Sequence, residues 1–320
     1  MAKRISNARR AKPRRAARKP IIVRHEGNPI LTAADWPYPV NTVFNAAAAI
    51  VDGETVLLVR VEDHSGVSHL TVARSADGVG GWRVGPRPAL APSPAHPEEA
   101  WGVEDPRLTW LEEAGCFAIA YTAYSHRGPL VALATTRDFK TFKRLGPALP
   151  PENKDAALFP TTFGGEWLML HRPVTGGFGA HIWLSRSPDL VHWGEHELVL
   201  QARSGPYWDA GKIGLSAPPL RTNKGWLILY HGVRNTCSGA IYRQGLALLD
   251  LADPTKVLAR TGDWLFGPEA GYERVGDVGN VVFCCGWTLV DKEVRLYYAG
   301  ADSNVCLATA RLGDLLGLLR

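Results

Sequence analysis

The chain has 320 residues, 46% of them hydrophobic, which is enough to bury a large core within one domain. Its formal net charge of +5 is unevenly distributed, because residues 1–20 contain nine Lys and Arg and no acid, which leaves 27 basic and 31 acidic residues in the rest. Neither a secretory signal nor a run of about 18 apolar residues is present, so we expect a soluble cytoplasmic protein without a membrane partner.

The first 20 residues predict a basic disordered arm, followed by a single domain over residues 21–320. The arm has no aromatic residue on which a nucleic-acid base could stack, so nucleic-acid contact is the less favoured interpretation. The cysteines are odd in number and form no C-x-x-C pair, which favours reduced thiols over a disulfide framework or a zinc site. They are Cys116, Cys237, Cys284, Cys285 and Cys306.

A repeated pattern of strands is the strongest structural signal. Five copies begin at Phe44, Glu104, Leu158, Ser216 and Gly279, with a spacing of 54 to 63 residues. Each copy predicts a short strand, a turn, a strongly apolar strand, a variable loop and a third strand, and the first three add an S/T-x-D-x-x-x-W/F-like turn. Such repeats are typical of β-propellers, because one blade cannot bury both faces alone. We expect an all-β, five-bladed propeller, with one short helix in the terminal "LGDLLGLLR".

Polar residues interrupt the pattern where the first strand of each copy begins and the second ends. A hairpin brings these positions together, so they should meet at one mouth of the central channel. The strand starts contain Asn45, Glu104, Asp105, Lys154, Asp155, Asp209, Lys212, Glu273 and Asp277. The strand ends contain Arg60, Glu62, Asp63, Tyr124, His126, His171, Arg172, His231 and Asp302. A ring of ionisable side chains at one mouth predicts a binding site for a polar ligand.

Four basic residues come from two consecutive blades and the segments that precede them, which places them on one side of the channel. They are Lys154, Arg172, Lys212 and His231. Cations beside carboxylates suit an anion such as phosphate, for which arginine offers a fork of donors and lysine a point charge. The alternative is that each one forms a structural ion pair with a neighbouring acid, such as Lys154 with Asp155.

Asp105 is the acid that we single out, because Pro106 fixes the backbone after it and disfavours helix for Asp105 itself. A carboxyl at such a rigid strand entrance can hold a proton for a leaving group, although an Asp-Pro step also marks an ordinary turn. Aromatic side chains near the strand starts and ends offer the flat faces that sugar rings require. These are Trp101, Tyr124, Tyr207, Trp208, Tyr242 and Tyr272, whereas Trp82 and Trp193 in the repeated turn should pack blade against blade.

From Asn28 to Leu319 the sequence resembles glycoside hydrolase family 130, the β-mannoside phosphorylases and related β-mannosidases, which are five-bladed propellers. The segments that carry the resemblance include "WGVEDPRLTW", "PPENKDAALFP", "MLHRP", "WDAGKIG", "LILYHGV", "YERVGDVGNVVF" and "YYAGADS". Their number and order make it specific.

The resemblance implies that Asp105 is the catalytic acid, which passes its proton to the glycosidic oxygen through the 3-hydroxyl of the mannosyl unit. It implies that Lys154, Arg172, Lys212 and His231 bind phosphate. Inorganic phosphate would be a co-substrate, and the chemistry needs no metal or other cofactor. The residues of the mouth expected to contact the β-mannoside are Asn45, Arg60, Asp63, Glu104, Tyr124, Asp155, Tyr242, Glu273, Asp277 and Asp302.

Two departures bear on the substrate. Many members that act on β-1,4-linked mannooligosaccharides have Arg-Asn in place of Lys154 and Asp155, and Ser in place of Ala46. The versions "PPENKDAALFP" and "WGVEDPRL" look more like members that act on β-1,2-linked mannosides. We therefore expect inverting phosphorolysis of β-1,2-mannobiose or short β-1,2-oligomannosides to α-mannose 1-phosphate and the shortened sugar.

Two alternatives remain open. The first is an inverting β-1,2-mannosidase that uses water, with Glu273 or Asp302 as the base. The second is a propeller that binds carbohydrate without catalysis, for which the retained Asp105 opposite a cluster of cations would be unnecessary. The sequence leaves self-association to a homo-oligomer open.

Overall fold

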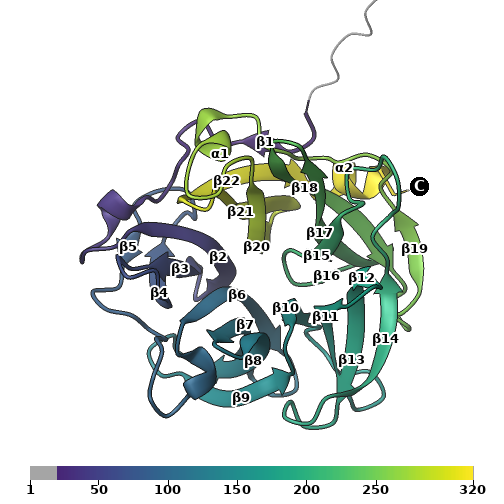
Figure 1. The fold of residues 1–320 in the computed structure, drawn as a ribbon, viewed down its shortest axis with the longest axis horizontal. Helices are drawn as coiled ribbons and strands as arrows, with labels where there is room; N and C mark the ends of the chain where they lie inside the picture. Colours follow the sequence, from purple (N-terminus) through teal and green to yellow (C-terminus); the bar gives the residue numbers. More distant parts are fainter. Residues whose placement is uncertain (1–19, 320) are drawn as a thin grey trace, which may run out of the picture.

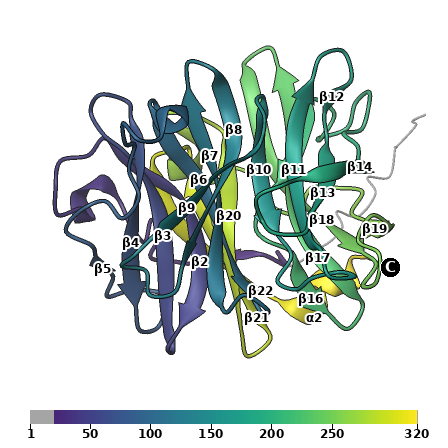
Figure 2. The ribbon, with the colours of Figure 1, turned by 90° about the horizontal axis from the view of Figure 1, so that it is seen from below.

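The blades of a propeller surround a central axis in the computed structural model, which describes residues 20–319. Antiparallel sheets radiate from this axis, and the chain passes from one to the next in sequence order (Figure 1). Figure 2 shows the same blades from the side, with their long strands roughly parallel to the axis. The predicted five-bladed, all-β architecture is confirmed, whereas the predicted basic arm lies, except for Pro20, outside the described residues.

Each blade has its innermost strand next to the axis, and later strands follow outward. Blade 1 contains β2 (Thr42–Val51), β3 (Glu54–Glu62), β4 (Ser68–Ser75) and β5 (Arg83–Val84). Blade 2 contains β6 (Gly102–Leu111), β7 (Cys116–Ser125), β8 (Gly128–Thr136) and β9 (Lys143–Leu149). Blade 3 contains β10 (Asn153–Leu158), β11 (Trp167–Thr175), β12 (Gly179–Ala180), β13 (Ile182–Ser187) and β14 (Gly194–Leu200). Blade 4 contains β15 (Lys212–Leu215), β16 (Leu220–Thr222), β17 (Gly225–Thr236), β18 (Gly239–Leu249) and β19 (Val257–Arg260).

The fifth blade takes strands from both ends of the described chain. It contains β20 (Val282–Val290), β21 (Glu293–Gly300), β22 (Asn304–Arg311) and, on the outside, β1 (Val23–Arg24), which pairs with β22. The pairing between an early and a late strand closes the ring, so every inner strand has a neighbouring blade on both sides.

Helices are few and short in the described residues. They are α1 (Gly271–Arg274), α2 (Leu312–Gly317) and the 3₁₀ turns η1 (Ala33–Asp35) and η2 (Pro97–Glu99). Helix α2 confirms the short helix predicted near the C-terminus. Within residues 20–319, no helix combines the length and the apolar character that crossing a membrane demands.

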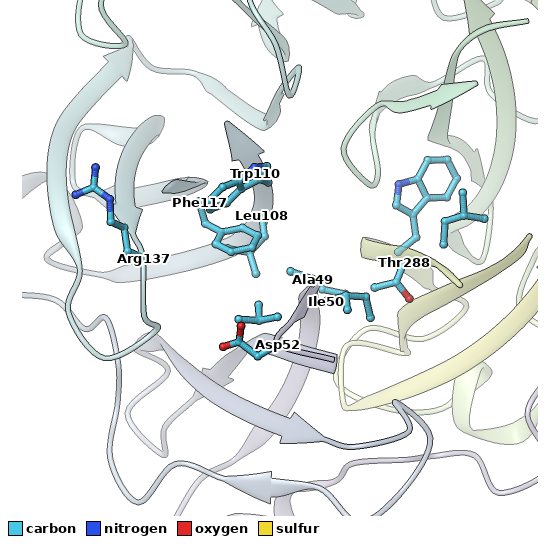
Figure 3. A pocket seen from close by; sticks show the side chains of 12 residues that line it. Ala49, Ile50, Asp52, Leu108, Trp110, Phe117, Arg137 and Thr288 are labelled. Carbon is cyan, nitrogen blue, oxygen red and sulfur yellow. The ribbon is translucent and has the colours of Figure 1, made fainter. Parts of the chain in front are cut away.

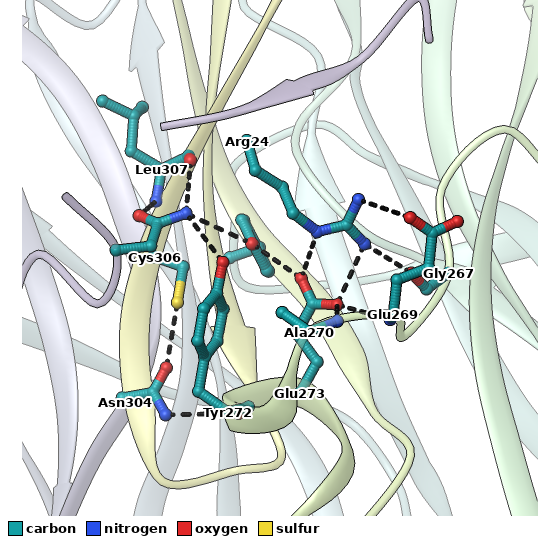
Figure 4. Close-up of polar contacts among 11 residues, drawn as sticks. Arg24, Gly267, Glu269, Ala270, Tyr272, Glu273, Asn304, Cys306 and Leu307 are labelled. Carbon is teal, nitrogen blue, oxygen red and sulfur yellow. Dashed lines mark hydrogen bonds and ion pairs between the residues drawn. The ribbon is translucent and has the colours of Figure 1, made fainter. Parts of the chain in front are cut away.

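A polar network fastens the closing strand to the segment around α1 (Figure 4). The guanidinium of Arg24 donates from Nε to Oε1 of Glu273 at 2.7 Å and from Nη2 to Oε2 at 2.9 Å. The hydroxyl of Tyr298 donates to the same Oε1 at 2.8 Å, and the Arg24 Nη2 also donates to the carbonyl of Gly267. The side chain of Glu273 is fully buried and committed to these contacts, so it holds β1 and α1 together.

The repeated turn forms as the sequence predicts. In blade 1 the Asp77 carboxylate accepts hydrogen bonds from the backbone amides of Val79 and Gly80, which folds the turn tightly. The Trp82 that follows packs edge to face on Tyr297 of blade 5, with ring centroids 6.1 Å apart. The turn tryptophan therefore packs blade against blade, as expected.

The two mouths of the ring differ in chemistry. A cavity of about 640 Å³ lies at the mouth formed by the ends of β2, β6 and β20, and its wall includes Ile50, Leu108, Trp110 and Phe117 (Figure 3). None of the predicted site residues lines it. The mouth formed by the starts of the inner strands is smaller and polar, and it is the mouth that contains the predicted site.

Candidate active site

A cavity of about 200 Å³ opens where the inner strands begin. Its wall contains ten of the fifteen predicted site residues, together with Val278, Val281 and Phe283. The ten are Asn45, Arg60, Asp105, Lys154, Asp155, Arg172, Lys212, His231, Tyr242 and Asp302. The strand starts and ends that carry these residues are far apart in the sequence, and the ring brings them to one place.

A bulge at the same position of three inner strands places three of these side chains. Asn45, Asp105 and Asp155 have left-handed backbones, with φ of 45°, 47° and 58°. At each one the pairing register with the second strand slips by one residue, so the inner strand bends. Asn and Asp tolerate this conformation better than other residues with a side chain, which explains why short polar residues occupy the bulges.

Asp105 lines the cavity. Its Oδ1 accepts hydrogen bonds from Asn45 Nδ2 at 2.7 Å and from Arg60 Nη1 at 2.9 Å. Burial alone would raise the pKa of the Asp105 carboxyl, but the positive charges of Arg60 and Lys154 hold that pKa below its ordinary value. Asp105 is therefore ionised at neutral pH when the cavity holds no sugar.

Asp302 is the second carboxyl group of the cavity, and its pKa is shifted in the opposite direction from that of Asp105. Its Oδ1 is buried and has no hydrogen-bond partner among the described residues. Burial and the nearby charge of Asp105 raise the pKa of Asp302 to about 7. Two neighbouring acids whose pKa values are shifted in opposite directions can together hold one proton near neutral pH, and that proton is on Asp302.

The raised pKa of Asp302 predicts a pH dependence of stability. Since the pKa is 3.8 in the unfolded chain and about 7 in the folded state, the folded protein binds this proton more tightly and loses stability as the pH rises between those values. An Asp302→Asn variant has no such proton. We expect the free energy of unfolding of the variant, relative to wild type, to increase across this window and to stay constant above it.

Urea unfolding of both proteins at a series of pH values measures this difference, in which the contributions of all other groups largely cancel. A difference that is the same at pH 4 and pH 8 would contradict the prediction.

The basic residues that line the cavity are bound in different ways. Asp155 Oδ2 accepts hydrogen bonds from Arg172 Nε at 3.0 Å and Nη2 at 2.8 Å, and Oδ1 accepts one from Arg107 Nη2 at 3.2 Å. Arg172 therefore forms the structural ion pair that the alternative predicts, whereas the ion pairs of the described residues include none between Lys154 and Asp155. Neither Lys154 nor Lys212 forms an ion pair with a described residue, so both ammonium groups remain available to an anion.

His231 differs from the sequence interpretation, which treated it as a cation. Burial lowers the pKa of its imidazole to about 3, so the ring is neutral at physiological pH. Its Nε2 lies 3.5 Å from Asp155 Oδ2, and its buried Nδ1 has no hydrogen-bond partner in the described chain. Gly214 gives the ring room, since a Cβ there would overlap both Asp155 and His231. His231 therefore offers a hydrogen bond to a ligand, and no charge.

Five predicted residues lie outside the cavity wall. Glu104 contacts Arg60 at 3.1 Å, next to Asp105, and Asp277 accepts a hydrogen bond from Asn41 at 3.1 Å. Asp63 accepts backbone hydrogen bonds that fold its own loop, from Ser65 and Val67. Tyr124 packs edge to face on the exposed Trp101, with centroids 5.4 Å apart. Glu273 is the fifth, and its ion pair with Arg24 leaves it a structural role.

Among the other aromatic candidates, Tyr242 lines the cavity, and its ring lies 5.9 Å from that of His231. Trp208 is buried instead, stacked on Tyr230 with its Nε1 donating to the carbonyl of Gly262. It belongs to the hydrophobic core between blades 3 and 4 and offers no face to a sugar.

Arg107 is a site residue that the sequence interpretation missed. It is fully buried in β6, and besides Asp155 it donates to the backbone carbonyls of Asp105, Leu215 and Ser216. It thereby links blades 2, 3 and 4 behind the cavity. The signal in the sequence is an arginine inside a strand, in "RLTW", where a buried charged side chain needs a partner.

A second group of polar residues contains side chains of the types that bind metals, but its buried carboxylate is already hydrogen-bonded to protein residues. His96, Glu98 and Glu99 lie close together in and next to η2. The Glu99 carboxylate accepts two hydrogen bonds from Arg144, at 2.9 Å each, and one from Tyr121. The group is therefore better explained as an ion pair that anchors η2 to blade 2.

Known proteins resemble this chain over nearly its full length. A curated relative, beta-1,4-mannooligosaccharide phosphorylase of Ruminococcus albus, is 35% identical over 94% of this chain and 92% of its own. Beta-1,2-mannobiose phosphorylase of Listeria innocua is 37% identical over 78% of this chain and 68% of its own. A solved structure of the Listeria innocua enzyme with beta-1,2-mannobiose superposes with a TM-score of 0.85 at 31% identity, covering 93% of this chain and 99% of that one.

The sequence model of glycoside hydrolase family 130, described as beta-1,4-mannooligosaccharide phosphorylase, matches residues 12–320. The match includes all inner strands and every residue of the cavity wall. Together with the propeller and its polar mouth, this match shows that the chain belongs to glycoside hydrolase family 130.

Proposed function

We propose that this protein is an inverting phosphorylase, which cleaves β-mannosides with inorganic phosphate to α-mannose 1-phosphate and the shortened sugar. One observation carries the proposal: the carboxyls of Asp105 and Asp302 and the cations Lys154, Arg172 and Lys212 line a single small cavity. A direct displacement at a sugar carbon requires an acid for the leaving oxygen and a site for the attacking anion beside the same sugar unit.

The roles follow from chemistry. A phosphate oxygen attacks the anomeric carbon of the mannosyl unit and forms the new bond as the glycosidic bond breaks, so one displacement converts the β-linkage into the α-product. Arg172 is oriented in advance by Asp155 and presents its remaining donors, while Lys154 and Lys212 supply charge. The proton for the departing oxygen comes from the acid, and family resemblance assigns the transfer to Asp105 through the 3-hydroxyl of the mannosyl unit.

The proposed substrate is β-1,2-mannobiose or a short β-1,2-oligomannoside. The relatives named above include enzymes of both linkages at similar identity, 35% and 37%, so overall identity does not choose between them. The segments "PPENKDAALFP" and "WGVEDPRL" favour the β-1,2 linkage, and both contribute to the cavity wall through Lys154, Asp155 and Asp105.

Inorganic phosphate acts as co-substrate in this scheme, which requires no metal or organic cofactor. Hydrolysis by water is the second candidate, because Asp302 lies in the cavity and its pKa of about 7 suits a general base. Glu273, the other proposed base, does not line the cavity. A cytoplasmic location and self-association remain predictions from the sequence.

The test is to incubate the protein with β-1,2-mannobiose in the presence and absence of phosphate and to follow the products by NMR. We expect turnover only with phosphate, and α-mannose 1-phosphate as the first product. β-1,4-Mannobiose under the same conditions measures the linkage preference. Release of free mannose at the same rate without phosphate would establish hydrolysis instead.

A further inference from the structure

A second cavity adjoins the basic residues of the active site. Its volume is about 440 Å³, and it is bounded by the start of β10, the hairpin of β11 and β12, and the segment that enters β15. Lys154, Arg172 and Lys212 line this cavity and the active-site cavity alike. The three cations therefore separate two spaces, one of which contains the acid pair.

The wall of the second cavity suits a small anion better than a sugar. It has no aromatic residue on which a sugar ring could stack, whereas the active-site cavity has Tyr242 and Phe283. Away from the cations it is formed largely by small residues, including Gly179, Ala180 and Gly211. These leave it open, and the cations give it a positive potential that concentrates anions.

The partition between the two cavities contains one side chain held by an ion pair and two without one. Arg172 is held by two hydrogen bonds from its guanidinium to Asp155. Lys154 and Lys212 are half-buried and form no ion pair with a described residue, and the Lys212 ammonium lies 5.4 Å from the centroid of the Tyr242 ring. Lysine side chains have four rotatable carbons and a compact charge, so these two can move with an anion and hand it from one cavity to the other.

We propose that the second cavity is the entrance for inorganic phosphate. A mannoside in the small active-site cavity covers the cations from the mouth, so phosphate that arrives after the sugar needs another route. The proposal rests on the proposed phosphorolysis. It predicts that either substrate can bind first, because each has its own way to the reaction centre.

A Val174→Trp variant tests the route. Val174 lines the second cavity at the end of β11 and is 44% exposed, so the larger side chain can narrow the entrance without entering the core. At saturating β-1,2-mannobiose we expect the KM for phosphate to rise roughly tenfold, within the one to three decades over which association rates vary among variants of one site. Phosphate must then enter before the sugar, so high mannobiose concentrations should become inhibitory.

Val191→Trp is the matched control, since Val191 is 47% exposed in the same blade and lines neither cavity. It should behave as wild type.

Glu152→Gln is the second test variant. Glu152 is the one acid among the described residues that line the second cavity. Its replacement removes a negative charge that repels phosphate, so the KM for phosphate should fall by about twofold.

Calorimetric titration of phosphate into the sugar-free protein tests whether Val174 lies on the entry route for phosphate or contacts the bound phosphate. Since the mouth is then open, Val174→Trp should bind phosphate with the wild-type Kd. If the wild-type enzyme needs phosphate but Val174→Trp changes neither the KM for phosphate nor the response to mannobiose, the second cavity is not the phosphate entrance. The proposed phosphorolysis would then still hold. Phosphate-independent turnover by wild type would overturn both.

Discussion

Replacing Asp105 with Asn should lower kcat for phosphorolysis of β-1,2-mannobiose by about 10² to 10⁴-fold, the range that a positioned general acid contributes. Asn keeps the size of the side chain and tolerates the left-handed backbone at this bulge, where φ is 47°. It cannot transfer the proton to the leaving oxygen. Initial rates at saturating sugar and phosphate measure the effect.

Asp52→Asn is the matched control, because Asp52 has a similar backbone, with φ of 50°, and lies at the opposite, apolar mouth of the ring. It should keep wild-type activity. An Asp105→Asn variant with full activity, beside an inactive Asp302→Asn variant, would show that Asp302 is the proton donor. Full activity in both variants would show that neither Asp105 nor Asp302 is the proton donor.

The scaffold could be predicted from the sequence because it repeats. Alternating apolar strands recur five times and the S/T-x-D turn three times, and each copy needs its neighbours to bury its faces, so the number of blades follows from the strand pattern. The mouth could be predicted for the same reason, since the start of each inner strand occupies the same place in its blade. Asn45, Asp105 and Asp155 are equivalent positions of three blades.

The prediction failed where the repeat is irregular. Glu273 was treated as a strand start, but β20 begins at Val282, and Glu273 belongs instead to α1, where Arg24 binds it. No local pattern shows this, because the partner is 249 residues away in the closing strand. The neutral state of His231 was missed for a related reason: its pKa depends on burial by several blades, which the sequence of one strand does not show.

The ion-pair partners of the buried acids also could not be predicted from the sequence. Lys154 is adjacent to Asp155 along the chain and lines the same cavity, yet Asp155 pairs with Arg172 and Arg107 from other strands. Arg107 shows that a charged residue inside a strand can orient a site residue such as Asp155 without lining the cavity itself.

These contacts make Asp155 the residue whose loss should affect stability most. An Asp155→Ala variant leaves the guanidinium groups of Arg107 and Arg172 buried without a counter-charge. Breaking one partner of a buried ion pair costs about 3 to 5 kcal/mol in free energy of unfolding, and we expect a loss of that size. Urea unfolding at neutral pH measures it.

Glu54→Ala provides the control, since Glu54 pairs with the exposed Arg83 and a surface pair contributes at most about 1 kcal/mol. The same Asp155 variant should weaken phosphate binding, because Arg172 loses the partner that orients its fork of donors. If Asp155→Ala unfolded like wild type and bound phosphate as tightly, the buried carboxylate would neither stabilise the ring nor orient Arg172. A large loss of stability with unchanged phosphate affinity in the folded fraction would instead assign Asp155 to the fold alone and leave Lys154 and Lys212 as the phosphate ligands.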